Sequence, residues 1–116
     1  MMLIYQNTEA WNALAEEERQ AMMEEAGEIW GNLMATGEVV SGEALAAPTL
    51  ARTIRVREGV SMVTDGPFIE AKEQLAGLVV FDVASEERAI EIATGWPDAR
   101  YWAVELRPLM HQGGEA

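Results

Sequence analysis

The sequence predicts an α+β domain in which two helices cover one face of an antiparallel sheet and an additional β-hairpin is attached. Three observations support this class. Short apolar or alternating runs typical of strands recur along the chain, two segments have helical periodicity, and turn residues separate them. A length of 116 residues suits one domain, which we expect over residues 1–110, followed by a C-terminal tail over residues 111–116.

The first elements are predicted to be a strand and a long helix. Residues 2–6 form a short apolar run, which indicates a buried strand. Residues 8–36 then place apolar side chains at helical spacing, which indicates one buried helix face. The residues of this face are Met22, Ala26, Ile29, Trp30, Leu33 and Met34. We expect Thr8 or Asn12 to cap the start of the helix, and Gly37 to end it in the left-handed conformation.

The middle of the chain is predicted to form strands. Residues 39–45 are apolar but interrupted by polar residues and a glycine, which predicts a bent or edge strand. Residues 52–57 alternate between apolar and charged side chains, and the Glu-Gly pair that follows predicts a hairpin turn that returns along residues 60–63. The apolar run over residues 77–83 predicts a central strand.

A second helix and a last strand complete the domain. Ser85 is a suitable N-cap, apolar residues follow at helical spacing, and Pro97 marks the end of this helix. Residues 101–108 alternate between apolar and polar side chains and predict a strand. The resulting order, β-α-β-hairpin-β-α-β, is that of a ferredoxin-like fold with an inserted hairpin.

The predicted sheet contains more apolar residues than one covered face requires. They lie in the runs over residues 39–45, 77–83 and 101–108. Two helices cover only one face, and a large exposed apolar face is unfavourable in water. We therefore expect a homodimer in which two copies pack sheet against sheet.

Composition excludes several classes of protein. The chain has 20 acidic and 8 basic residues and a formal net charge of -12 at pH 7, which argues against binding to nucleic acid or to an anionic membrane surface. Cysteine is absent and His111 is the single histidine, so thiolate and multi-histidine metal sites are excluded. We expect neither a metal nor a cofactor. Without a targeting signal or an apolar run of membrane-spanning length, the expected location is the cytoplasm.

Acidic residues are concentrated in the first part of the chain. Residues 1–43 contain nine acidic residues and one basic residue. A solvated helix face explains this pattern, and a surface that binds a basic protein partner is the alternative.

The densest polar stretch covers residues 65–74 and includes the single lysine of the chain. In a functional interpretation, Asp65 or Glu73 acts as a general acid or base or holds a cation, and Lys72 binds an anion. In a structural interpretation, Asp65 caps backbone N–H groups in a turn and Phe68 anchors the loop in the core. The residues alone leave both interpretations open.

A few aromatic residues and the histidine add weaker signals. Most tryptophans fall on predicted core faces, but Trp11 and Trp102 are candidates to line a pocket. His111 lies in the predicted tail, where it is either exposed to solvent or closes over a cleft of a partner subunit.

The block over residues 64–77 resembles the YCII-related proteins, in particular the branch named for the Asp-Gly-Pro-Phe tetrapeptide, here at residues 65–68. The start over residues 2–5 and the later segment over residues 104–108 also fit, so the resemblance covers nearly the whole chain. It implies a bacterial protein and a dimeric α+β barrel of ferredoxin-like subunits.

The resemblance also suggests functional residues. Some relatives are thought to be enzymes, by analogy with a His–Asp pair in the wider family, but this sequence has no histidine in its first predicted helix. That pair therefore cannot be transferred to this chain. The residues that match the branch motif indicate Asp65 and Glu73 as catalytic candidates. The same loop supplies the candidate ligand contacts Phe68, Glu70 and Lys72.

Three hypotheses for function follow from these observations. The first is a small-ligand-binding protein or weak enzyme with a cleft near the Asp-Gly-Pro-Phe loop. The second is a regulatory module that engages an extracytoplasmic-function sigma factor, with which some relatives are associated, or another basic protein. In the third, the motif is purely structural and serves the turn and the dimer interface.

Overall fold

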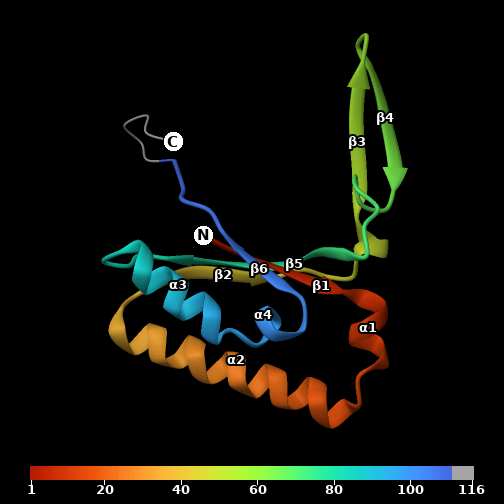
Figure 1. Cartoon of the computed structure of the whole chain (residues 1–116). Helices are drawn as coiled ribbons and strands as arrows, with labels where there is room; N and C mark the ends of the chain where they lie inside the picture. The colour runs from red at the N-terminus through yellow and green to blue at the C-terminus, as the bar shows by residue number, and fades with distance from the viewer. Residues whose placement is uncertain (111–116) are drawn as a thin grey trace.

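A four-stranded antiparallel sheet forms the centre of the molecule. In a computed structural model of the chain, which describes residues 1–110, the strand order of this sheet is β2-β5-β1-β6 (Figure 1). The strands are β1 (Met2–Asn7), β2 (Val39–Ala44), β5 (Glu73–Phe81) and β6 (Ala103–Leu106). This order confirms the predicted ferredoxin-like α+β fold, with β5 and β1 as the central strands. The predicted tail, including His111, lies outside the described residues.

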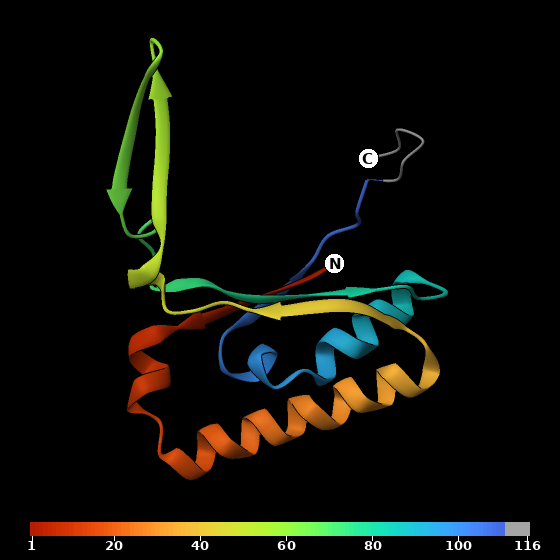
Figure 2. The ribbon, with the colours of Figure 1, turned by 180° about the vertical axis from the view of Figure 1, so that it is seen from behind.

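Helices cover one face of this sheet. They are α1 (Thr8–Ala13), α2 (Glu16–Thr36), α3 (Glu86–Gly95) and α4 (Pro97–Tyr101). Seen from behind, all of them lie on the same side of the sheet, and its opposite face is uncovered (Figure 2). Within residues 1–110, no helix has both the length and the apolar composition needed to cross a membrane.

The predicted first helix is in fact two helices. Leu14 and Ala15 adopt extended backbone conformations between α1 and α2, and the Arg19 guanidinium donates hydrogen bonds to the Trp11, Asn12 and Leu14 carbonyls at this break. The prediction of Thr8 or Asn12 as N-cap was also wrong. Asn7 caps α1, with its side-chain oxygen accepting a hydrogen bond from the Ala10 N–H at 2.9 Å.

The long helix α2 packs its predicted apolar face onto the sheet. Met22 and Leu33 are buried, and Trp30 packs against a core that includes Met2 and Val79. Met34 is 61% exposed, contrary to the prediction; it follows Leu33 by about 100° around the helix axis and therefore faces solvent. Gly37 ends α2 with a φ of 78°, which confirms the predicted left-handed stop.

The second half of the chain follows the prediction with two changes. Strand β5 begins at Glu73, so part of the predicted site loop belongs to the sheet. The chain also forms α4 from Pro97 onward, where the sequence predicted only a helix end. Proline at the first helical position fits the start of this short helix, since its ring fixes a helical φ and it lacks an N–H. Ser85 caps α3, as predicted, by accepting a hydrogen bond from the Arg88 N–H.

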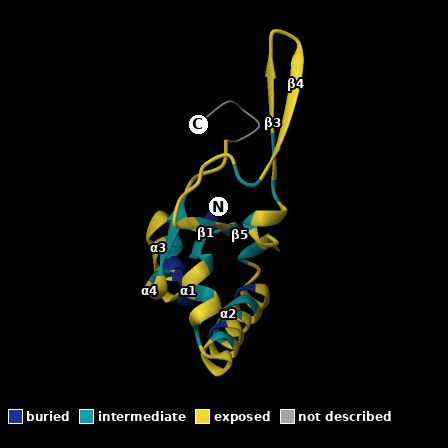
Figure 3. Ribbon diagram, turned by 90° about the vertical axis from the view of Figure 1, so that its right-hand side faces the viewer, coloured by how far each residue is buried: buried dark blue, intermediate teal, exposed yellow. Residues whose placement is uncertain are grey.

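The inserted hairpin is a separate two-stranded sheet. It consists of β3 (Arg52–Arg57) and β4 (Val60–Asp65), joined through Glu58 and Gly59 and preceded by a short 3-10 turn at Pro48–Leu50. Both turn residues have positive φ values, 52° and 77°, as a tight two-residue hairpin turn requires. The hairpin stands away from the uncovered side of the four-stranded sheet, and nearly all of it is exposed (Figures 1 and 3).

Candidate functional site

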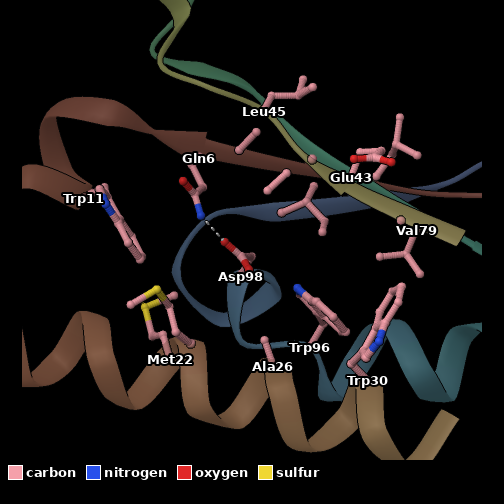
Figure 4. A pocket seen from close by; sticks show the side chains of 17 residues that line it. Gln6, Trp11, Met22, Ala26, Trp30, Glu43, Leu45, Val79, Trp96 and Asp98 are labelled. Carbon is pink, nitrogen blue, oxygen red and sulfur yellow. Dashed lines mark hydrogen bonds between the residues drawn. The ribbon is translucent and has the colours of Figure 1, made fainter. Parts of the chain in front are cut away.

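A cavity lies between α2 and the sheet. We call it the helix–sheet cavity; its volume is about 530 Å³, and strands β1, β2 and β5, helix α2 and the start of α4 supply its walls (Figure 4). Most of the lining is apolar. The lining includes three tryptophans, Trp11, Trp30 and Trp96, and the polar residues Gln6 and Asp98.

Two glycines let the cavity form beside closely packed strands. A Cβ atom on Gly42 would lie 2.8 Å from the Trp30 ring, and a Cβ atom on Gly77 would lie 2.9 Å from the Glu43 carbonyl oxygen. Both distances are too short for real side chains. The glycines therefore allow β2 and β5 to approach each other and allow the Trp30 ring to lie against the sheet.

Asp98 is the chemically distinctive residue of the cavity. It lies in the first turn of α4, is only 6% exposed, and is the one buried charged residue in the described part of the chain. The Gln6 side-chain amide donates a hydrogen bond of 2.8 Å to its carboxyl group (Figure 4). Burial raises the pKa of Asp98, because a charged carboxylate is poorly solvated in this environment, and the Gln6 hydrogen bond offsets part of that effect.

The prediction from sequence missed Asp98. The sequence predicts a helix end at Pro97 and a strand from residue 101, and Asp98 falls between them with no element assigned; aspartate is rarely buried in proteins. The signal that would have found it is an aspartate between a buried tryptophan and a strand, in a segment that folds back under the sheet. Trp11, a sequence candidate for a pocket, does line the cavity. Trp102 is not among the lining residues and instead packs on Trp11, with ring centroids 6.1 Å apart.

The arrangement can perform two kinds of chemistry. An apolar cavity with one buried carboxyl can bind a molecule that places an amine or hydroxyl on that carboxyl and apolar groups against the aromatic walls. A carboxyl with a raised pKa can also exchange a proton with a bound group. Within residues 1–110, no three His, Cys, Asp or Glu side chains are grouped so that they could hold a metal ion.

The predicted residues Asp65 and Phe68 lie at the base of the hairpin, away from this cavity. Asp65 forms an ion pair of 3.2 Å with Arg52, and its side chain is 87% exposed. Phe68 is 66% exposed, so it does not anchor the loop in the core. The Arg55 guanidinium carbon instead lies over the Phe68 ring, 4.8 Å from the ring centroid. The turn is held instead by the Gly66 N–H, which donates to the Ala51 carbonyl at 2.8 Å.

The structure brings together two other predicted residues. Glu70 and Lys72 line a recess of about 410 Å³, which we call the outer recess, beside the start of α1. The Gln74 side chain holds this loop by donating hydrogen bonds to the Ile69 and Ala71 carbonyls at 2.8 and 3.0 Å. Glu73 is exposed at the first position of β5 and lines neither the recess nor the cavity.

The outer recess and the helix–sheet cavity are neighbours. A smaller hollow of about 250 Å³ shares Gln6 and Trp11 with the cavity and Thr8 and Gln74 with the recess. A line of hollows therefore runs along α1 from Asp98 toward the loop over residues 65–74, which the sequence predicts as a candidate site.

Comparison with known proteins is consistent with this architecture. Topology, inserted hairpin and helix–sheet cavity define the class as a small ferredoxin-like α+β domain with an internal cavity. The family model of the YCII-related domain matches residues 1–111. An uncharacterized protein of Rhizobium meliloti (strain 1021) is 31% identical over 117 residues, covering 98% of this chain and 94% of the relative. The chain therefore belongs to the YCII-related family.

Proposed function

We propose that the protein binds a small organic amine in the helix–sheet cavity, with the amino group on Asp98 and apolar groups against Trp11, Trp30 and Trp96. The observation that carries this proposal is the buried Asp98 carboxyl in a largely apolar cavity. A volume of about 530 Å³ is within the range of small-molecule sites, and such sites combine apolar walls with a few fixed polar groups.

The energetics of Asp98 support a cationic ligand. The Asp98 carboxyl is buried and its hydrogen-bond donors, the Gln6 amide, the Trp96 side chain and its own backbone N–H, are all neutral, so no positive charge compensates the solvation that a carboxylate loses there. An ammonium group beside it would form a charge-assisted hydrogen bond in a site of low dielectric constant. Binding would therefore lower the pKa of Asp98 from its raised value toward the ordinary one.

The loop residues keep a role in this proposal. Glu70 and Lys72 contact the outer end of a longer ligand through the outer recess. The catalytic role considered for Asp65 and Glu73 has less support, since both are exposed and neither lines the cavity. In a weak enzyme, Asp98 is the group placed to exchange a proton with the bound molecule. A cytoplasmic location is part of the proposal and is compatible with a sequence without cysteine.

Binding of three probes of equal length tests the proposal. Calorimetry compares hexylamine, 1-hexanol and hexanoate on the wild type and on Asp98→Asn. We expect the amine to bind most tightly and hexanoate most weakly. Asp98→Asn should remove about 1.5–3 kcal/mol of amine binding, the contribution of a hydrogen bond to a charged group, and should leave hexanol binding nearly unchanged.

Lys72→Gln is the matched control, because Lys72 lines only the outer recess and the probes are too short to need it. Its amine affinity should equal that of the wild type. Equal affinity of the wild type and Asp98→Asn for hexylamine would contradict the proposal, as would a wild type that binds none of the three probes.

A second candidate function rests on the charge of α2. The exposed residues Glu16, Glu17, Glu18, Glu24 and Glu28 lie on this helix. They could bind a basic surface, for example that of an extracytoplasmic-function sigma factor. Glu25 is already engaged, since the Arg100 guanidinium donates to both of its carboxylate oxygens at 2.9 and 3.0 Å. Charge reversal at Glu24 and Glu28 should abolish binding to such a sigma factor in calorimetry, and retained binding would remove this candidate.

A further inference from the structure

The outer recess is the polar end of the line of hollows that begins at Asp98. Its ionisable lining residues are Glu9, Glu70 and Lys72. All three are exposed, and within residues 1–110 none of them takes part in an ion pair. Two carboxylates against one ammonium give the recess a net negative charge at neutral pH. It therefore favours a cationic group, although it contains the single lysine of the chain.

Gln6 and Gln74 connect the two ends of this line. The Gln6 amide donates a hydrogen bond of 2.8 Å to Asp98, and Gln6 is the register partner of Gln74 across β1 and β5 (Figure 4). Gln74 in turn donates to the carbonyls of both chain neighbours of Glu70, at 2.8 and 3.0 Å. Register partners of an antiparallel sheet lie about 5 Å apart, so the path from Asp98 to Glu70 has a length on the order of 10 Å.

The space between the two ends suits an aliphatic chain. We call the hollow of about 250 Å³ between the cavity and the recess the connecting hollow. Trp11 and Leu45 line both this hollow and the helix–sheet cavity, and Pro48 lines both the hollow and the outer recess. None of the described residues that line the connecting hollow is charged. A run of methylene groups can therefore pass through it while the charged groups stay at the two ends.

We propose that the ligand is a linear diamine or a longer polyamine. One ammonium group lies on Asp98, the methylene chain passes Trp11 through the connecting hollow, and the second ammonium group lies by Glu9 and Glu70. Lys72 opposes the second ammonium group and limits its affinity. This inference rests on the proposed binding of an amine in the helix–sheet cavity, and it adds the class of amine: a dication with its charges separated by an aliphatic chain.

Three probes with equally long chains test the class of ligand in calorimetry on the whole chain. They are octylamine, octamethylenediamine and ω-aminooctanoate, which share one ammonium group and differ at the other end. We expect the diamine to bind roughly threefold more tightly than octylamine, the size of effect that an exposed ion pair produces. The ω-aminooctanoate should bind most weakly, because its carboxylate meets the net negative charge of the outer recess.

Substitutions in the outer recess should change diamine affinity in opposite directions. Glu70→Gln should lower it and Lys72→Gln should raise it, each by roughly threefold, and neither should change octylamine affinity. Opposite signs distinguish contact with the ligand from a loss of folding. Glu24→Gln is the matched control, since it removes the same charge from an exposed position of α2 that does not line the recess. It should leave diamine affinity unchanged.

The outcomes separate this inference from the proposed function. Diamine binding no tighter than octylamine binding would overturn the inference and leave the amine site standing. Equal diamine affinities of the wild type, Glu70→Gln and Lys72→Gln would do the same, as would equal losses in Glu70→Gln and Glu24→Gln. Tightest binding of ω-aminooctanoate would assign the outer end to Lys72 and also overturn the diamine. A wild type that does not bind octylamine would contradict the proposed function itself and this inference with it.

Discussion

Asp98 occupies a position where carboxylates are seldom found, 6% exposed among tryptophans and aliphatic side chains. Its neighbours in sequence explain the placement. Trp96 and Pro97 are both buried. Trp96 caps α4 and Pro97 is its first residue, so the helix places Asp98 under the sheet beside Gln6. Burial of Asp98 therefore depends on where the chain returns in space, which residue spacing alone does not show.

Asp98→Asn should make the protein more stable at neutral pH. The folded-state pKa lies above the ordinary 3.8. Below pH 3.8 the Asp98 carboxyl keeps its proton in both the folded and the unfolded protein. Between pH 3.8 and the raised folded-state pKa, the unfolded protein releases this proton and the folded protein keeps it. The free energy of unfolding therefore falls as pH rises through this range. Urea unfolding of the wild type should show this fall, and Asp98→Asn should lack it. An Asp98→Asn variant less stable than the wild type at neutral pH, with an unchanged pH slope, would contradict this account.

Glu38 should show the opposite pH dependence. The Arg88 Nε and Nη2 atoms donate to its two oxygens, both at 2.9 Å, and the Thr36 hydroxyl also donates to it. These hydrogen bonds, mainly those from Arg88, lower the pKa of Glu38 from 4.5 to about 2. The resulting stability is present above pH 4.5 and is lost as pH falls toward 2.

Glu38→Gln should therefore unfold at lower urea concentration than the wild type at neutral pH, and the difference should shrink in acid. Glu91 serves for comparison, because it also pairs with Arg88, three residues earlier on α3, but its side chain is 72% exposed. Glu91→Gln should change stability much less, since exposed pairs contribute little. Equal effects of the two variants at neutral pH would argue against a special role for Glu38.

At the scale of elements, features fixed by local chemistry were predictable. Ser85 caps α3 and Gly37 ends α2, because an N-cap acceptor and a left-handed stop depend on a few neighbouring residues. The break at Leu14 was not predictable in this way. It depends on Arg19, whose guanidinium reaches three carbonyls across the gap between α1 and α2.

Ser85→Ala tests the contribution of one cap. The Ser85 side chain accepts a hydrogen bond of 3.1 Å from the Arg88 N–H, so its loss should cost about 1 kcal/mol of stability. Ser85→Asp, which retains an acceptor, should restore most of it. Chemical denaturation measures both variants, and an alanine variant as stable as the wild type would show that the cap has no net effect.

At the scale of the whole molecule, the order of elements along the chain and the inserted hairpin followed from the pattern of turns and apolar runs. The position of the site did not. The sequence predicts a site at residues 65–74, but the structure places these residues in different locations. Asp65 pairs with Arg52, while Glu70 and Lys72 line the outer recess. An Asp-Gly-Pro-Phe segment is conspicuous in a sequence, whereas a cavity formed by α2, β1 and α4 exists only after folding.

The molecule has three separate surfaces with different chemistry. The helix–sheet cavity is largely apolar with one buried acid, the exposed face of α2 is acidic, and the hairpin combines an apolar face with arginines. The proposed ligand site therefore lies apart from the hairpin. Val63→Asp, a substitution on the hairpin, should leave hexylamine affinity unchanged.

A ligand in the helix–sheet cavity beside Asp98 would lie against indole rings, so the indole N–H signals of a ¹⁵N-labelled protein report on the proposed site. Trp11, Trp30 and Trp96 line the cavity, so hexylamine should shift their assigned signals along one saturating curve. This response should be lost in Asp98→Asn. Shifts confined to the backbone amides of residues 70–72, with unchanged indole signals, would place the ligand in the outer recess and contradict the proposal.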